Sequence, residues 1–235
     1  MIAAAALCPC PPLLAPGLTG QEEALPELRA ACAAAVARLL AAAPEVIAVV
    51  GPDERTGPWP PDGRLDVATY APAVVRAAET AGAGRRPSLP LSLGIGALLL
   101  DEAGYAGPRA LHGVAQTEPP AGCLALGREI AASAARVGLL AMGDGSARRS
   151  LSAPGYLDER AAPFDAAVER AVRDGDLAAL GALDPELAAA LLAAGRPAWQ
   201  VLAGGMNAAP PETKILYADA PLGVAYLVAT LVPRP

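Results

Sequence analysis

The sequence predicts a single α/β domain over residues 1–235, with a mixed, mostly parallel central sheet flanked by helices. Three short apolar runs, Ile2–Leu7, Val46–Val50 and Val137–Met142, are each closed by glycine or proline, as is typical of buried strands. The stretch Gln21–Ala43 separates the first two runs and repeats its apolar residues at helical spacing. Because a strand, a helix and a second strand form a parallel βαβ unit, we expect the three runs to be adjacent in one sheet.

Composition limits the classes of function. The 235 residues are 54% hydrophobic and 3% aromatic, with a formal net charge of -6, and this acidic balance argues against nucleic-acid binding. The apolar N-terminal run has no basic residues before it and is cut short by Pro9, so neither a signal peptide nor a membrane span is expected. The four cysteines lack the paired spacing of a zinc site. We therefore expect a cytoplasmic protein with reduced cysteines and no role at a membrane.

The remaining elements follow from periodicity and from turn residues. Further strands are expected at Val67–Thr69, Ala110–Val114, Lys214–Tyr217 and Val224–Thr230. Further helices are expected at Ile95–Ala103, Glu118–Arg136, Phe164–Asp174, Asp176–Ala182, Asp184–Gly195 and Ala198–Ala203. The Pro- and Gly-rich stretch Thr56–Leu65 predicts a loop, and Gly94 and Gly96 predict a turn that leads into the helix beginning at Ile95.

Polar residues crowd the turn that follows Val137–Met142. Asp144, Ser146, Arg148 and Arg149 lie there, at the strand end where α/β proteins bind ligands. Ser146 has no base nearby in the sequence, so it is not assigned as a nucleophile. We favour the interpretation that Asp144 and Ser146 cap the turn through side-chain to backbone hydrogen bonds. The two arginines predict either a solvated loop or an anion clamp.

Several short motifs in a fixed order point to a known family. They are Cys8-Pro-Cys-Pro-Pro12, Val49-Val-Gly-Pro52, Gly143-Asp-Gly-Ser146 with the later Tyr156 and Phe164-Asp165, and Ala194-Gly-x-x-x-Trp199. In this order the chain resembles, over nearly its whole length, the class III (LigB-type) extradiol ring-cleavage dioxygenases and their Memo-type relatives. The resemblance implies one α/β domain with a mixed sheet. In active members it implies one non-haem Fe(II) held by two His and one Glu, with a further His as acid/base beside the ring.

None of the four residues that this resemblance implies is present. Cys10 stands at the first His ligand, and Asp53, or Glu54 after a slip of one residue, stands at the second. Ala147 stands at the acid/base His, and Gln200 is the nearest match to the Glu ligand. The one histidine of the chain, His112, lies in another segment and is expected in the core. We therefore expect the fold without the dioxygenase activity, and neither a metal nor another cofactor.

Two functional hypotheses follow. The favoured one is a non-dioxygenase member that binds a small molecule or a protein partner, with a homodimer left open. Cys10, Asp53, Asp144, Ser146 and Gln200 are expected to line its cleft, with Glu54, Ala147 and Arg148 as further candidates and no catalytic or metal-ligating residue assigned. The alternative is an enzyme of altered chemistry, in which Cys10 and Asp53 bind Fe(II) or another divalent metal, or Cys10 acts as a thiol, on an aromatic or other small molecule. Against this alternative, Cys8 and Cys10 are expected to point to opposite faces, so that at most one faces the pocket.

Overall fold

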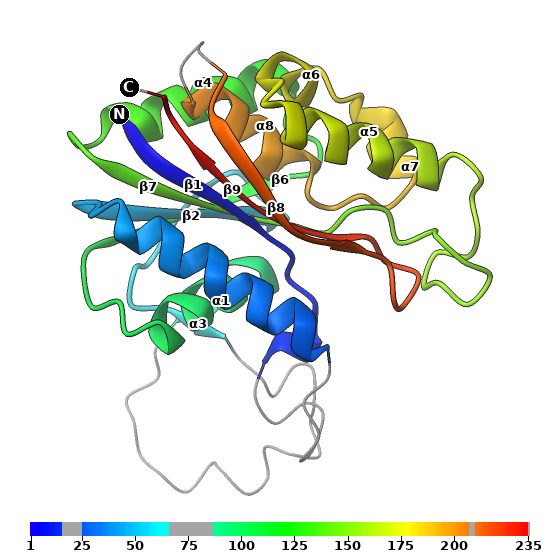
Figure 1. Cartoon of the computed structure of the whole chain (residues 1–235), viewed down its shortest axis with the longest axis horizontal. Coiled ribbons are helices and arrows are strands. Elements are labelled where there is room, and N and C mark those ends of the chain that lie inside the picture. Colours follow the sequence, from blue (N-terminus) through cyan, green and yellow to red (C-terminus); the bar gives the residue numbers. More distant parts are fainter. Residues whose placement is uncertain (16–24, 66–86, 207–209, 235) are drawn as a thin grey trace, which may run out of the picture.

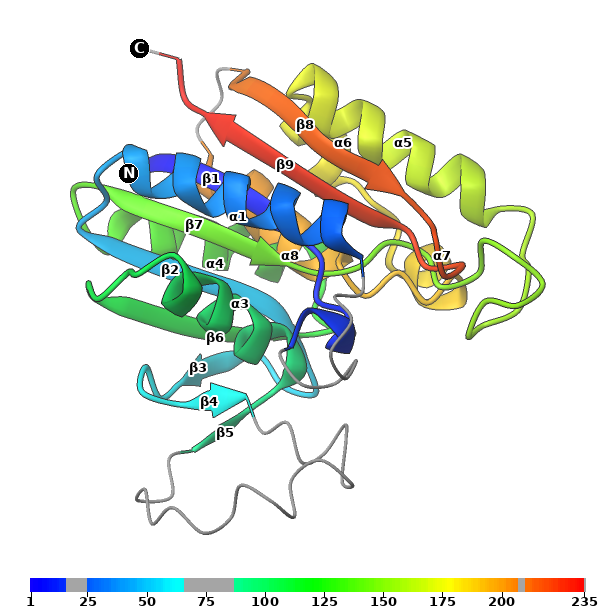
Figure 2. The same cartoon turned by 60° about the horizontal axis from the view of Figure 1, so that its bottom comes forward.

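A computed structural model describes residues 1–15, 25–65, 87–206 and 210–234. In these residues a seven-stranded sheet has the strand order β3-β6-β2-β7-β1-β9-β8 (Figure 2). Its strands are β1 (Ile2–Cys8), β2 (Val46–Asp53), β3 (Gly57–Trp59), β6 (Arg109–Ala115), β7 (Val137–Met142), β8 (Glu212–Asp219) and β9 (Tyr226–Val232). A small second sheet pairs β4 (Arg64–Leu65) with β5 (Ser88–Leu89). The predicted fold class, one α/β domain with a mixed central sheet flanked by helices, is confirmed.

The centre of the sheet is parallel and its margins are antiparallel. Strand β7 pairs in parallel with both β1 and β2, and β2 pairs in parallel with β6. Strands β3, β9 and β8 run antiparallel to their neighbours. The three predicted runs are therefore adjacent, with β7 inserted between β1 and β2. As a result the last residues of four strands meet at one margin of the sheet, which we call the carboxyl edge.

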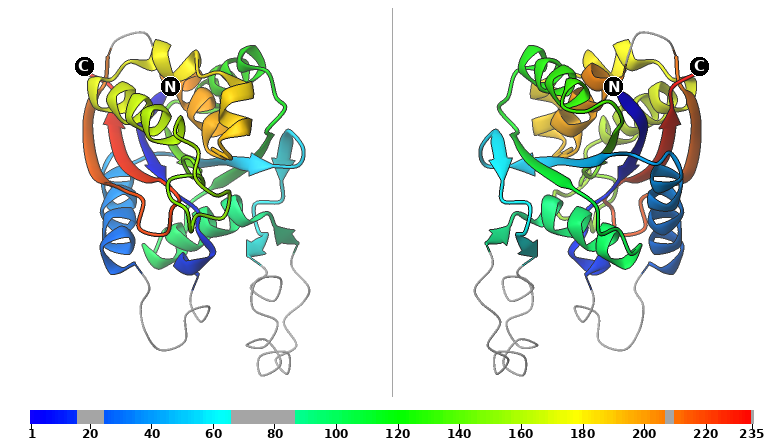
Figure 3. Two further views of the ribbon diagram at one scale, coloured as in Figure 1. Left: turned by 90° about the vertical axis from the view of Figure 1, so that its right-hand side faces the viewer. Right: turned by 90° about the vertical axis from the view of Figure 1, so that its left-hand side faces the viewer.

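Helices cover both faces of the sheet (Figures 1 and 3). One face carries α1 (Pro26–Ala41) and α3 (Leu91–Glu102), and a short 3-10 helix, η1 (Pro12–Leu14), follows β1. The other face carries α4 (Pro120–Ala132), α5 (Ala161–Asp174), α6 (Leu177–Gly181), α7 (Pro185–Ala190) and α8 (Arg196–Gly205). Successive strand residues point to opposite faces, so Ile47 and Val49 join the core under α1 and α3, while Ala48 and Val50 join the core under α8.

Two predictions about local structure were wrong. Helix α3 begins at Leu91 and contains both Gly94 and Gly96. The helix packs so closely against neighbouring segments that a side chain at either glycine position would clash with them. A Cβ on Gly96 would be 2.5 Å from Val49 Cγ1, and one on Gly94 would be 2.7 Å from a methyl of Leu65. The stretch predicted as a loop, 56–65, contributes β3 and β4.

Other predicted bounds were closer. Asp184 caps α7, since its Oδ1 accepts from the backbone N of Glu186 at 2.8 Å, with Pro185 at the first helical position. That helix ends at Ala190 rather than at Gly195, and Leu192 then adopts a left-handed φ of 54°. The predicted strand Val67–Thr69 and the predicted helix start at Gln21 lie outside the described residues. In the described parts of the chain, no helix has the length and apolar character needed to cross a bilayer.

Candidate functional site

The turns after β1 and β7 meet at the carboxyl edge through Cys10 and Asp144. The backbone N–H of Cys10 donates to Asp144 Oδ1 at 2.8 Å. Burial raises the pKa of Asp144 to about 6, although the hydrogen bonds from Cys10 lower it. Burial, and then the nearby Asp144 carboxylate, raise the pKa of the Cys10 thiol well above its usual value. Cys10 therefore keeps its proton at neutral pH and is a poor nucleophile.

The orientation predicted for the cysteines was wrong. Cys8 and Cys10 are both buried in the core under α1 and α3. Residues two apart along an extended chain point the same way, so a shared face is the expected geometry. Both thiols are thus held among apolar side chains, and hydrogen bonding to Cys32 raises the pKa of Cys8 as well.

Ser146 holds the glycine-rich turn to its surroundings. Its Oγ donates to the carbonyl of Leu191 at 2.8 Å and accepts from the backbone N of Arg148 at 3.1 Å. Its own backbone N donates to Asp165 Oδ1 at 2.9 Å. The interpretation of Ser146 as a turn-capping residue is confirmed, and Ala147 next to it is fixed by a backbone bond to Leu191.

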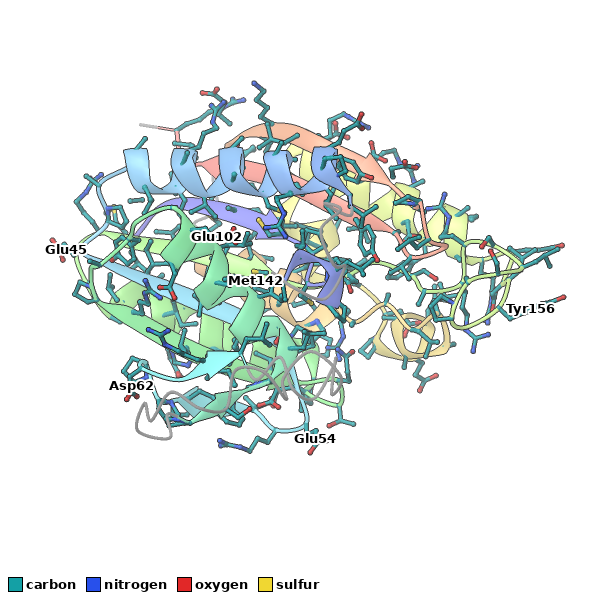
Figure 4. The ribbon with its side chains drawn as sticks, turned by 90° about the horizontal axis from the view of Figure 1, so that it is seen from below. Glu45, Glu54, Asp62, Glu102, Met142 and Tyr156 are labelled. Atoms are coloured by element: carbon teal, nitrogen blue, oxygen red, sulfur yellow. The ribbon has the colours of Figure 1, made fainter. Side chains whose placement is uncertain are left out.

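Asp53, at the end of β2, is occupied by hydrogen bonds. Its Oδ2 accepts from Trp59 Nε1 and its Oδ1 accepts from the backbone N of Glu54, both at 2.7 Å. Arg55 stacks over the Trp59 ring at 4.7 Å from the centroid. Glu54 is exposed and lies at the margin of the molecule, apart from Met142 at the end of β7 (Figure 4). Asp53 therefore anchors the short strand β3, and Glu54 faces solvent.

Gln200 lies in the helical layer on the other face of the sheet. It is fully buried, and its Oε1 accepts from Arg196 Nη1 at 2.8 Å. Its Nε2 donates to the carbonyls of Gly181 and Leu183, at 3.1 and 2.9 Å. The structure thus brings Cys10 and Asp144 together and holds Gln200 in the opposite layer, where α8 packs on α6.

The residues at the implied ligand positions do not fit an Fe(II) centre of two His and one Glu. Cys10 is protonated, both oxygens of Asp53 accept hydrogen bonds, and the amide of Gln200 is buried in another layer. His112 lies in β6, where burial lowers its pKa and keeps the imidazole neutral. Within residues 1–15, 25–65, 87–206 and 210–234, no three His, Cys, Asp or Glu side chains gather closely enough to hold a metal ion.

A cavity of about 180 Å³ opens at the carboxyl edge between the 145–149 turn, α5 and the turn joining β8 to β9. Its charged lining consists of Arg149, Asp165, Glu169 and Asp219. Arg149 Nη1 forms an ion pair with Asp165 Oδ2 at 3.1 Å, so the charge of this partly exposed arginine is paired and it is not a free anion clamp. Burial raises the pKa of Asp165, although the bonds from Ser146 and Arg149 lower it.

Two aromatic side chains, Trp199 and Tyr226, also line this cavity. Both are almost fully buried, at 2% and 4% exposure. Burial, and then the neighbouring Asp144 and Cys10, raise the pKa of Tyr226 far above its usual value, so its phenol stays neutral. The cavity therefore combines carboxylates with neutral aromatic side chains.

Sequence reasoning missed most of this cavity. Asp165 belongs to a quoted motif and could have been selected as the carboxylate that follows the glycine-rich turn. Asp219 ends β8, and its Oδ1 accepts from the backbone N of Ala220 at 2.7 Å, a contact typical of a turn residue. Tyr226 carries no signal in the sequence, because only the antiparallel return of β9 brings it to the carboxyl edge.

Comparison with known proteins supports the fold. No family model matches the sequence, and no curated protein matches it either. The structure is similar to the crystal structure of uncharacterized protein JW3007 from Escherichia coli K12, with a TM-score of 0.55 and 14% sequence identity. The match covers 98% of this chain and 99% of the other. At this identity the likeness concerns the architecture alone.

Proposed function

We propose that this chain has an extradiol-dioxygenase-like fold, does not cleave catechols, and binds a small organic cation at the carboxyl edge of its sheet. The observation that carries the proposal is the lining of the 180 Å³ cavity, where Trp199 and Tyr226 accompany three carboxylates and one arginine. The arginine is paired with Asp165, and Glu169 is paired with Arg173, which lies outside the lining, so Asp219 is the lining carboxylate whose charge has no ion-pair partner among the described residues.

This lining suits an ammonium or guanidinium group. Aromatic side chains attract cations, and Trp199 and Tyr226 border the cavity, although each ring exposes only a small part of its surface. Asp219 stands at the cavity without an ion-pair partner among the described residues, so its charge is available to a ligand. An anionic ligand would meet Asp219 with no unpaired cation in the lining to offset it, because Arg149 is paired with Asp165 and Arg173 with Glu169.

The size of the cavity limits the ligand. Its volume, about 180 Å³, lies below the ~300–1,000 Å³ of pockets that hold drug-sized molecules. We therefore propose a ligand of a few heavy atoms, such as a short alkylamine or an alkylguanidine.

The contacts of Cys10 and Asp53 argue against the alternative of altered metal or thiol chemistry. A thiol whose pKa is raised by burial and by a carboxylate does not supply the thiolate that nucleophilic or metal-binding cysteines need. Asp53 would have to leave Trp59 to bind a metal.

The test is a binding measurement with ethylamine, ethanolamine and methylguanidine, with acetate and phosphate as anionic probes. We expect at least one cation to raise the melting temperature and to give a saturable calorimetric isotherm that weakens with salt. The pair of changes Glu169→Gln and Asp219→Asn should weaken its binding by roughly tenfold, about 1.4 kcal/mol, because it removes two negative charges at the cavity.

Asp184→Asn is the matched control. Asp184 caps α7 and does not line the cavity, and Asn remains a good capping residue. Binding of the anions but not of the cations, or equal cation affinity in the Glu169/Asp219 variant and the control, would contradict the proposal.

A further inference from the structure

Asp144 is enclosed by residues that line the 180 Å³ cavity, although it does not border the cavity itself. Gly145, the next residue, does line it, and Gly145 N donates to Ala225 O, also in the lining, at 2.8 Å. The backbone O of Asp144 accepts from Gly195 N at 2.8 Å. A Cβ on Gly195 would lie 2.3 Å from Cζ2 of Trp199, so this residue separates Asp144 from the indole ring. The turn that carries Asp144 is therefore tied to both β9 and α8 behind the wall of the cavity.

Two ionisable side chains face the Asp144 carboxyl, and neither is a cation. Cys10, in the turn after β1, donates its backbone N–H to Oδ1 at 2.8 Å, and its thiol hydrogen-bonds to the same carboxyl. Tyr226, at the start of β9, lies close enough that the charge of Asp144 raises the pKa of the phenol. Within the described residues, no basic group acts on Asp144. Its negative charge is therefore buried without a positive partner.

Tyr226 connects this buried carboxyl to the cavity. The residue borders the cavity and is also a neighbour of Asp144. Because Tyr226 is only 4% exposed, little solvent screens a charge on its cavity side from a charge on its inner side. A cation in the cavity would thus supply the positive charge that Asp144 lacks, and it would favour the ionised form of the carboxyl.

We propose that Asp144 couples cation binding at this cavity to the release of a proton, so that the site binds cations more tightly when the Asp144 carboxyl is ionised. On binding, the proton of Asp144 passes to solvent, and the new carboxylate balances the charge of the ligand. The coupling is reciprocal, since a cation that favours the ionised carboxyl must itself bind better to the ionised protein. This inference rests on the proposed function and adds its regulation by pH.

The ionisation of Asp144 falls in an accessible pH range. Burial raises its pKa to about 6, so the carboxyl is mostly protonated at about pH 5 and almost fully ionised at about pH 7.5. Asp165, which lines the cavity and is paired with Arg149, also has a pKa raised by burial. A variant of Asp144 alone separates the two carboxyls, because the contribution of Asp165 remains in it.

The test is isothermal titration calorimetry with ethylamine and methylguanidine, strong bases that remain cations at both pH values. For the wild type we expect affinity to rise roughly five- to tenfold from about pH 5 to about pH 7.5, as the ionised fraction of Asp144 rises from about one tenth to nearly one. At about pH 6, titrations in two buffers of different ionisation enthalpy should show the release of about half a proton for each cation bound.

Asp144→Asn imitates the protonated carboxyl and keeps an acceptor for Cys10 N–H. It should bind the probes like the wild type at about pH 5 and roughly five- to tenfold more weakly at about pH 7.5, and its proton release should be much smaller. Asp184→Asn is the matched control. Asp184 also accepts from a backbone N–H, but it lies outside the cavity, so this variant should follow the wild type at both pH values.

The outcomes separate this inference from the cation site on which it rests. If neither probe binds the wild type at either pH, the cation site is wrong and its regulation falls with it. Saturable binding with equal affinity at both pH values, or without proton release at about pH 6, would leave the cation site standing and overturn the inference. An Asp144→Asn variant with the pH dependence of the wild type would also overturn it, because the titration would then belong to another group such as Asp165.

Discussion

At the scale of single residues, the carboxyl edge shows how burial decides what a side chain can do. Asp144 and Cys10 would suggest a reactive pair from their residue types alone. Burial raises the pKa of both groups, and their hydrogen bond joins two turns of the sheet. The pair therefore stabilises the fold and is not a reactive site. Ser146 is likewise a capping residue and not a nucleophile, because its Oγ donates to a backbone carbonyl.

Asp144 should make stability depend on pH. Its pKa is raised from 3.8 to about 6, so between these values the folded protein holds a proton that the unfolded chain releases. Stability therefore falls as pH rises through this window. Asp144→Asn keeps an acceptor for Cys10 N–H and removes the titration. At pH 7 we expect the variant to be more stable than the wild type by up to about 3 kcal/mol, and this difference should vanish near pH 4.

Urea unfolding at several pH values measures this difference. The exposed Asp62→Asn serves as a control and should follow the wild type throughout. Parallel stability curves for the wild type and Asp144→Asn would show that the Asp144 carboxyl does not titrate in this window. Asp165, whose pKa is also raised by burial, is present in all three proteins and cancels in the comparison.

At the scale of helices and strands, the sequence predicted most elements where a periodic pattern or a cap defines them. The strands Val46–Val50 and Val137–Met142 are continuous apolar runs, and Asp184-Pro185 is a cap signal that local chemistry fully explains. The predictions failed where a glycine serves packing. Gly94 and Gly96 suggested a turn, but they lie within α3 because that helix needs a smooth face against Leu65 and Val49. Local propensity contains no information about this distant contact.

The contact between α4 and α8 depends on glycines in the same way. A Cβ on Gly127 would lie 2.1 Å from Val201 O, and one on Gly204 would lie 2.2 Å from Leu124 O. On a free helix surface, Gly→Ala stabilises by roughly 0.5–1 kcal/mol. Here we expect Gly127→Ala to cost about 1–3 kcal/mol, because the added methyl group meets rigid backbone.

Chemical denaturation provides the measurement, with Gly181→Ala in α6 as the control. The nearest atom to a Cβ on Gly181 is Leu124 Cδ2 at 3.3 Å, a methyl group that can move. Its change in unfolding free energy should be much smaller than that of Gly127→Ala. A Gly127→Ala variant as stable as the wild type would mean that the two helices are not in such close contact.

At the scale of the whole molecule, the parallel centre of the sheet could be predicted from the sequence. Only some of the residues at the candidate site could be predicted in the same way. Parallel connections require the ends of β1, β2 and β7 to share one edge, which explains why Cys10 and Asp144 meet. The cavity beside them also needs β8, which runs in the direction of β1 and ends with Asp219 at this edge, and β9, which runs antiparallel to both and begins there with Tyr226. The positions of these two residues depend on contacts between the two ends of the chain, and no local sequence motif predicts such contacts.

The whole arrangement predicts that this protein does not cleave catechols when supplied with iron. Extradiol cleavage needs an Fe(II) that binds catecholate and O₂ together, and a base beside the ring. The four positions at which the resemblance implies these roles read Cys10, Asp53, Ala147 and Gln200. In the structure the thiol is protonated, the carboxylate accepts from Trp59, and the amide lies in the opposite helical layer. Even changes beside metal ligands commonly cost 10–100-fold in affinity or activity, so loss of the ligands themselves should abolish the reaction.

The measurement is anaerobic reconstitution with Fe(II), followed by oxygen and a panel of catechols, with the yellow ring-opened product followed by absorbance. We expect no product above the rate of free Fe(II), while an active extradiol dioxygenase treated in parallel should turn over. Turnover by this chain that disappears in Cys10→Ala or Asp53→Ala would contradict the prediction. It would require Asp53 to release Trp59 and Cys10 to lose its proton, and it would identify a thiolate and a carboxylate as sufficient ligands for this chemistry.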